Sequence, residues 1–228
     1  MIVFEKVSKK YPLGNFALQN ISFKLEDNDF VFLVGPSGAG KTTILRLILG
    51  EYPPSAGTIM VDNLDISDKK FNQFEALRRR IGFVFQDFKV LADKNVFENI
   101  ALALKVVGIM PEKIEEEVKK ALELVGLKNK EQVFPIQLSA GELQRIAIAR
   151  AIVGNRDIIL ADEPTGNLDP KTAWEIMKIF KKLDGKRTIV IATHNTDIVN
   201  SLKKRVIYLK EGKIINCLLY TSPSPRDS

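Results

Sequence analysis

Gly35-Pro-Ser-Gly-Ala-Gly-Lys-Thr-Thr43 is the stretch that decides the fold, because it matches the phosphate-loop pattern G-x-x-x-x-G-K-[ST] at every fixed position. The apolar run Phe30-Val-Phe-Leu-Val34 before it predicts a buried strand. Residues 42–49 after it predict a helix, and Gly50 is placed to end that helix. A strand, a glycine loop and a helix in this order favour a phosphate site over an accidental run of small residues.

Each part of this loop has a chemical role in holding a phosphate. Glycines let successive backbone N–H groups turn toward phosphate oxygens, and the following helix presents its positive end to the same anion. Lys41 would place its charge on the β- and γ-phosphates, and the Thr42 hydroxyl could be a ligand of Mg²⁺. The candidate cofactor-binding residues are therefore Gly35, Pro36, Ser37, Gly38, Ala39, Gly40, Lys41, Thr42 and Thr43.

The composition predicts one globular domain with a sizeable core, because 45% of the 228 residues are hydrophobic and 27% are charged. No apolar run approaches the ~18 residues that would span a bilayer, and no charged apolar leader suggests secretion. The single cysteine, Cys217, excludes an internal disulfide and a cysteine metal cluster, and it fits a reducing compartment. The net charge of +6 comes from basic pairs and triplets without interleaved aromatic residues. This pattern indicates solvated helix faces more than a nucleic-acid surface, and it is equally compatible with weak attraction to an anionic membrane.

An apolar strand is expected over residues 157–161, and it delivers two carboxylates, Asp162 and Glu163, at its carboxyl end. Beside a phosphate loop these acids divide into two roles. Asp162 is expected to hold Mg²⁺, and Glu163 is expected to polarise the water that attacks a γ-phosphate. A merely solvated strand end is the alternative, which the phosphate-loop pattern disfavours.

Two further strands are expected to end in polar residues. Residues 81–85 predict a buried strand that ends at Gln86, whose side chain could reach a metal or an attacking water. Residues 188–192 predict another strand, which ends at Thr193 and His194, the only histidine of the chain. Open α/β sheets build their sites at such edges, so His194 could donate to a γ-phosphate. A surface glutamine and a structural histidine are the alternatives.

Residues 87–155 read as mostly helical, which predicts a helical lobe inserted between two α/β halves. Within the lobe, Ser139-Ala-Gly-Glu142 opens a helix. Ser139 is a good N-cap and Glu142 completes a capping box, which is the purely local interpretation. A Ser-Ala-Gly turn at a helix N-terminus is also an anion site, so we expect both interpretations to hold together.

Strands are expected at residues 2–7 and 17–25, and a polar helix at residues 69–79. Tyr11 lies between the first two strands and could either stack on a base or fold onto the core. Residues 216–228 are rich in serine and proline toward the end and lack periodicity, so we expect a disordered, non-native tail.

These motifs, in this order, resemble the ATP-binding cassette (ABC) ATPases over residues 2–215. The resemblance is carried by the phosphate loop, Gln86 as the Q-loop residue, Leu138-Ser-Ala-Gly-Glu142 as the signature, Ile158-Ile-Leu-Ala-Asp-Glu163 as the Walker B strand, Asn167-Leu-Asp169 as the D-loop, His194 as the switch histidine and Tyr11 as the aromatic that stacks on adenine.

The resemblance implies an α/β fold of the P-loop NTPase class and ABC type. It has a mixed central sheet, an N-terminal antiparallel β subdomain and a helical subdomain inserted at about residues 87–155 of one domain, 1–215. It also implies ATP and Mg²⁺ as cofactors, and a homodimer in which the Lys41 loop of one chain holds ATP that Ser139 and Gly141 of the other chain close, with Asp169 nearby. The candidate catalytic residues are Glu163, His194, Lys41 and Gln86, and the candidate metal ligands are Thr42, Gln86 and Asp162.

Within this family, residues 32–43, 78–88, 134–138 and 192–195 resemble the ATP-binding subunits of bacterial cell-division complexes. That likeness implies an integral membrane subunit as partner, a cytoplasmic location on the inner face of the cell membrane, and no nucleic-acid partner. Lipoprotein-release and macrolide-export ATPases share most of these residues and are alternatives, and a soluble ABC protein that acts on nucleic acid is a more distant one. Ala140 replaces the first of the two glycines that usually follow the signature serine, so a nucleotide switch with little turnover is a further alternative.

Overall fold

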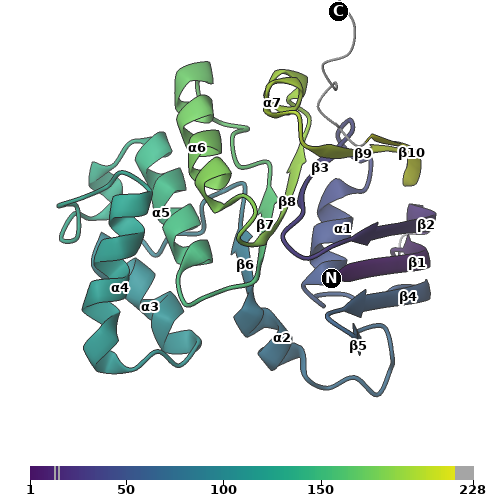
Figure 1. The fold of residues 1–228 in the computed structure, drawn as a ribbon, viewed down its shortest axis with the longest axis horizontal. Coiled ribbons are helices and arrows are strands. Elements are labelled where there is room, and N and C mark those ends of the chain that lie inside the picture. Colours follow the sequence, from purple (N-terminus) through teal and green to yellow (C-terminus); the bar gives the residue numbers. More distant parts are fainter. Residues whose placement is uncertain (13, 15, 219–228) are drawn as a thin grey trace, which may run out of the picture.

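The structure, a computed structural model, describes residues 1–12, 14 and 16–218, and consists of two sheets packed about a central helix, with a helical lobe at one end (Figure 1). The first sheet is antiparallel, in the order β2 (Phe16–Leu25), β1 (Ile2–Lys10), β4 (Ala56–Val61) and β5 (Leu64–Asp65). The second is parallel except at its edge strand β10, in the order β10 (Lys213–Leu218), β9 (Arg205–Lys210), β3 (Phe30–Val34), β8 (Thr188–Thr193), β7 (Ile158–Asp162) and β6 (Ile81–Val84).

Helices α3, α4 and α5 gather in a lobe at the end of the molecule away from the antiparallel sheet (Figure 1). None of the helices in the described part of the chain is long and apolar enough to cross a membrane. The helices are α1 (Lys41–Ile48), α2 (Phe74–Arg80), α3 (Val96–Val106), α4 (Pro111–Leu124), the 3-10 turn η1 (Pro135–Gln137), α5 (Ala140–Ile152), α6 (Pro170–Leu183) and α7 (Thr196–Leu202). This architecture confirms the expected α/β fold with a mixed sheet, an antiparallel β subdomain and an inserted helical subdomain.

The parallel sheet separates two hydrophobic cores, because successive side chains of a strand point to opposite faces. In β3, Phe30 and Phe32 pack with the helical lobe, whereas Val31 and Leu33 pack with α1 and the antiparallel sheet. The strand is therefore apolar throughout, as expected for a parallel strand that is covered on both faces.

The register of the parallel strands brings their carboxyl ends to one edge. Val34 of β3 lies opposite Thr193 of β8, and Asp162 of β7 lies opposite Ala192 of β8. The phosphate loop after β3, the acids at the end of β7 and His194 after β8 consequently meet at this edge.

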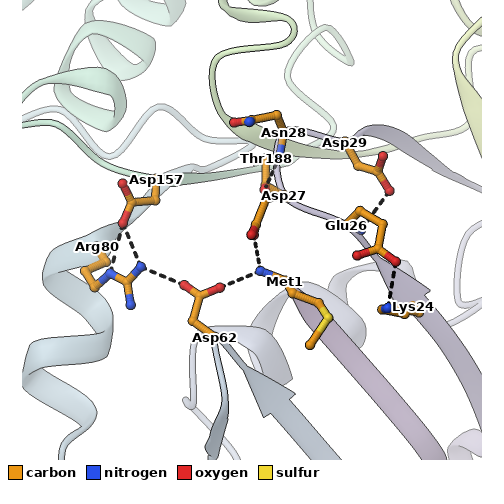
Figure 2. Close-up of polar contacts among 10 residues, drawn as sticks. All are labelled: Met1, Lys24, Glu26, Asp27, Asn28, Asp29, Asp62, Arg80, Asp157 and Thr188. Carbon is orange, nitrogen blue, oxygen red and sulfur yellow. Dashed lines mark hydrogen bonds and ion pairs between the residues drawn. The ribbon is translucent and has the colours of Figure 1, made fainter.

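An ionic network lies at the amino ends of these strands and links the two sheets (Figure 2). Arg80, at the end of α2, donates to Asp157 before β7 at 2.8 and 2.9 Å and to Asp62 after β4 at 2.7 Å. The amine of Met1 pairs with Asp62 and with Asp27. The hydrogen bonds to Asp157 are the main reason why the pKa of Arg80 is raised. The network fixes the antiparallel sheet against the parallel one without entering the site edge.

Three expected boundaries need correction. The polar helix begins at Phe74 instead of residue 69, because Asp68 turns the chain there by accepting the N–H of Lys70 at 2.9 Å. Strand β6 ends at Val84, so Gln86 lies in the following turn and not directly at the strand end. Strand β10 continues to Leu218 by pairing with β9, so residues 216–218 are part of the sheet, and the rest of the expected tail lies outside the described residues.

Candidate functional site

The phosphate loop places an open helix N-terminus at the carboxyl edge of the parallel sheet. Gly40 precedes α1 with a φ of 104° and has no side chain that could cap the helix. A Cβ there would lie 2.6 Å from the carbonyl oxygen of Ala17, so only glycine fits. The first N–H groups of α1 are thus directed at the loop, where an anion would bind.

Lys41 is buried inside this loop. Its Nζ donates to the carbonyl oxygens of Gly35 at 2.7 Å and of Pro36 at 3.1 Å, and it lies 3.4 Å from Oε1 of Glu163. The side chain is 7% exposed, so its charge is held by the loop and by this carboxylate. The charged oxygens of a bound phosphate would compete with these groups for the ammonium group of Lys41.

Thr42 and Asp162 form the candidate metal position. Oγ1 of Thr42 donates to Oδ1 of Asp162 at 2.9 Å. Burial raises the pKa of Asp162, the hydrogen bond from Thr42 opposes that rise, and the neighbouring charge of Glu163 adds to it. A hydroxyl and a carboxylate side by side are hard oxygen donors of the kind that Mg²⁺ binds. The donor set therefore fits this ion.

Glu163 has an uncommon backbone conformation, and its carboxylate lies between Lys41 and His194. Its φ is 47°, in the left-handed region, and its N–H donates to the carbonyl oxygen of Ala192 at 2.9 Å. Its Oε2 lies 3.0 Å from Nδ1 of His194 and accepts the backbone N–H of the same residue at 3.3 Å. Strained residues of this kind cluster at active sites. Lys41, Glu163 and His194 form one continuous contact chain.

A cleft of about 590 Å³ joins these groups. It is lined by the phosphate loop together with Gln86, Glu163 and His194, so residues expected from three strand ends do come together. Tyr11 is not part of this lining, but its hydroxyl lies 3.5 Å from Oγ1 of Thr43, at the margin of the cleft.

Three further candidates line a second cleft of about 350 Å³, which shares no residue with the first. It contains Ser139, Gly141 and Asp169. Asp169 caps α6 by accepting the N–H of Thr172 at 3.1 Å, and the pKa of its carboxyl group is lowered by hydrogen bonding to Thr172. One chain alone therefore holds the two groups of candidates apart.

The start of α5 explains why position 141 requires glycine and why position 140 tolerates alanine. A Cβ on Gly141 would lie 2.5 Å from Cγ2 of Thr172, so a larger residue would collide with α6. Ala140 is exposed and is not among the residues with positive φ, so its methyl group is accommodated without strain. Alanine in place of the usual glycine therefore does not distort this turn.

A family model described as ABC transporter matches residues 18–166. The cell division ATP-binding protein FtsE of Bacillus subtilis (strain 168) is 49% identical over 216 residues, which are 94% of this chain and 95% of that protein. The chain belongs to the ABC transporter family.

Solved structures of the ABC family agree with this assignment. The dimeric structure of a post-hydrolysis state of the ATP-binding cassette MJ0796 bound to ADP and Pi matches with a TM-score of 0.88 and 34% identity, covering 97% of this chain and 100% of that one. CbiO1 of Clostridium perfringens, described as part of the ABC transporter complex cbiONQ, matches with a TM-score of 0.86 and 31% identity, covering 96% of this chain and 88% of that one. As a member of this family, the chain is an ATP-binding ATPase.

The ABC match includes the phosphate loop, Gln86, the signature and Glu163, whereas Tyr11, Asp169 and His194 lie outside residues 18–166. Several lining residues were not anticipated from the sequence, and one in each cleft lies against a glycine. Ala17 lines the first cleft, and Thr172 faces Gly141 in the second. Neither residue belongs to a motif. Each matters because it lies so close to a glycine distant in sequence that no larger residue fits there.

Proposed function

We propose that the chain is the ATPase subunit of a membrane complex that acts in bacterial cell division. The observation that carries the proposal is the cleft in which Lys41, Glu163 and His194 are in contact, on a chain 49% identical over nearly its whole length to a protein named as a cell division ATP-binding protein.

In this proposal the contacts of Glu163 change when ATP binds. The γ-phosphate becomes the ion-pair partner of Lys41 in place of Glu163. This frees Oε1 of Glu163 to accept a proton from the attacking water. His194 keeps the carboxylate in place through Oε2 and is close enough to donate to the phosphate. Mg²⁺, held by Thr42, Gln86 and Asp162, would neutralise charge on the phosphate oxygens.

A homodimer would complete the site. The second cleft, with Ser139, Gly141 and Asp169, lies apart from the phosphate loop of its own chain, so it would close over ATP bound to a second copy. The crystallised relative MJ0796 is dimeric with ADP and Pi bound, which supports this arrangement. Closure would exclude water and align Glu163 with its target.

The membrane partner would dock beside Gln86. A groove of about 260 Å³ lies there, with the partly exposed apolar side chains of Phe85, Leu102 and Val106 and the cations Lys89 and Arg150 on its walls. We propose that it receives a cytoplasmic helix of an FtsX-like integral membrane subunit, which keeps the ATPase on the inner face of the cell membrane. CbiO1, described as part of a transporter complex, is a relative that works as one subunit among several.

Substitution of Glu163 by Gln tests the catalytic part of the proposal. Glu163→Gln should lower ATP turnover by about 10²- to 10⁴-fold, because a general base is lost, and should leave an ATP-bound dimer in size-exclusion chromatography. Glu75→Gln, on an exposed glutamate of α2, is the matched control and should change neither property. A Glu163→Gln chain that stays monomeric at saturating ATP would contradict the dimer model.

A groove substitution tests the membrane part. Leu102→Asp should abolish co-purification with a membrane subunit and preserve ATP binding, since Leu102 lies outside the phosphate cleft. Identification of the co-purified subunit by mass spectrometry then decides the biological role. An export permease in place of an FtsX-like protein would refute the assignment to cell division.

A further inference from the structure

Tyr11 does not stand alone beside the phosphate loop but is enclosed by Lys9 and Tyr52. The rings of Tyr11 and Tyr52 meet edge to face, with centroids 5.9 Å apart and an interplanar angle of 86°. Nζ of Lys9 lies 5.5 Å from the centroid of Tyr11 and 5.4 Å from that of Tyr52, so one cation serves both rings.

The backbone fixes this cluster from both sides. Nζ of Lys9 donates to the carbonyl oxygen of Pro53 at 2.7 Å. The N–H of Ser55 donates to the carbonyl oxygen of Ser8 at 2.8 Å, and Oγ of Ser55 accepts the N–H of Lys10 at 2.9 Å. The segment that follows α1 is thereby bound to the end of β1, from which Tyr11 emerges.

Lys9 is 9% exposed, and burial lowers the pKa of its ammonium group. Among the described residues, the rings of Tyr11 and Tyr52 and the carbonyl oxygen of Pro53 lie around this charge. A buried lysine is retained at a cost, so its position between two tyrosines needs a reason beyond packing.

We propose that Tyr52 and Lys9 are positioning residues for the base of the nucleotide, because they hold the ring of Tyr11 in the orientation in which a purine stacks on it. The inference rests on the proposed function, since it requires ATP in the phosphate cleft. Tyr11 reaches that cleft through its hydroxyl, 3.5 Å from Oγ1 of Thr43, while Tyr52 belongs to the segment after the same helix. The base platform and the phosphate loop are therefore both anchored to α1.

The expected gain in ATP affinity comes from the immobilisation of the Tyr11 ring before the base binds. A ring that is already immobilised loses less side-chain entropy when a base stacks on it, and this difference corresponds to about two- to tenfold in affinity. Because Lys9, Tyr11 and Tyr52 do not line the phosphate cleft, binding of a ligand without a base should not depend on Tyr52 or Lys9.

The test compares ATP with magnesium tripolyphosphate, which has the phosphates and lacks the base. Tyr52→Leu should weaken ATP binding about two- to tenfold and raise KM with kcat unchanged, while affinity for tripolyphosphate is unchanged. Tyr52→Phe retains the ring and should bind ATP as the parent does. Lys9→Met, which keeps the apolar stem, should behave like Tyr52→Leu.

Phe16 offers a matched control, because it also has a lysine over its ring, Nζ of Lys10 at 5.5 Å, and is 51% exposed. Among the described residues its ring meets no second aromatic ring. Phe16→Leu should change neither affinity. In a Tyr11→Ala background, Tyr52→Leu should have no further effect on ATP binding, since its influence passes through Tyr11.

Two results would overturn the inference: full ATP affinity in Tyr52→Leu, or an equal loss of ATP and tripolyphosphate affinity, which would mean that Tyr52 merely supports α1. Failure of the proposed function looks different. If the parent chain does not bind ATP, the fault lies in the nucleotide site itself and not in the positioning of Tyr11.

Discussion

The starts of α1 and α5 are built from similar turns of small residues, but they differ in capping. The N-terminus of α1 is open, with no side-chain cap, whereas that of α5 is closed by a capping box. Helix α1 begins after Gly40, which has no side chain to cap it. Helix α5 begins after Ser139, whose Oγ accepts the N–H of Glu142 at 3.3 Å, while the carboxylate of Glu142 accepts the N–H and the hydroxyl of Ser139 at 3.0 and 2.9 Å.

This difference indicates an order of events. A phosphate meets free N–H groups and Lys41 at α1, whereas at α5 it meets a carboxylate that already occupies the helix end. Lys130, whose Nζ lies 3.3 Å from Oε1 of Glu142, balances that charge. We therefore expect ATP to bind first at α1, and the start of α5 to engage it only when a second chain approaches and Glu142 moves aside.

Removal of the charge at α1 should have the largest effect. Lys41→Met should weaken ATP binding about 10- to 100-fold, since charge-assisted hydrogen bonds to the phosphates are lost. Equilibrium dialysis or calorimetry measures this change. The matched substitution at the other helix start, Lys130→Met, should leave ATP affinity of the monomer unchanged. An equal loss of ATP affinity in both variants would mean that the two helix starts do not differ in how they bind ATP.

Overpacking at α5 should come next. Gly141→Ala places a Cβ 2.5 Å from Cγ2 of Thr172, so we expect a loss of about 1–3 kcal/mol in the free energy of unfolding, and weaker ATP-dependent dimerisation. Denaturant unfolding and analytical ultracentrifugation measure the two effects. Gly141→Ala combined with Thr172→Ser, which removes the Cγ2 methyl group, should recover most of the stability. Without that recovery, the collision with α6 is not the cause.

Neutralisation of Glu142 tests whether α5 is closed by its own carboxylate. Glu142→Gln keeps a capping side chain but removes the charge, so the ATP-dependent dimer should become about three- to tenfold tighter, while ATP affinity of the monomer is unchanged. A weaker dimer would show that the carboxylate assists closure.

Acid titration gives an independent measure of the same contact. The N–H of Ser139 is the main group that lowers the pKa of Glu142. A lowered carboxyl pKa stabilises the fold above the ordinary glutamate range, and this contribution disappears as pH falls through the lowered value. The stability difference between the parent chain and Glu142→Gln should accordingly be present at pH 7 and vanish in acid.

Local sequence patterns were sufficient for the regular elements and for the site edge. Residues 30–50 specify strand, loop and helix by themselves, and the carboxyl ends of parallel strands necessarily meet, so Lys41, Gln86, Glu163 and His194 could be expected to gather. The start of α2 was misjudged because an Asp68 turn competes with helix formation.

Contacts between distant segments could not be predicted in this way. No pattern near Tyr11 in the sequence predicts its contact with Tyr52, which follows α1. Lys9 and Lys10 together are typical of a surface lysine pair, although Lys9 is buried. The collision partner of Gly141 lies on α6, so its glycine requirement is invisible in the signature itself. Such features depend on packing distances and not on periodicity.

The smallest effect should come from the residue in which the signature departs from its family. Ala140 is exposed, begins α5 and has no positive φ, so its methyl group neither relieves nor causes strain. Ala140→Gly should leave ATP affinity unchanged, leave turnover unchanged or slightly raised, and lower the free energy of unfolding by at most about 1 kcal/mol through added backbone freedom. Side-by-side turnover assays and denaturant unfolding of Ala140→Gly and Gly141→Ala would measure this. A large fall in turnover for Ala140→Gly would show that the methyl group is needed for closure of the dimer. If instead position 140 accepts either residue while position 141 accepts only glycine, the difference between these neighbours is explained by Thr172, which contacts only the second.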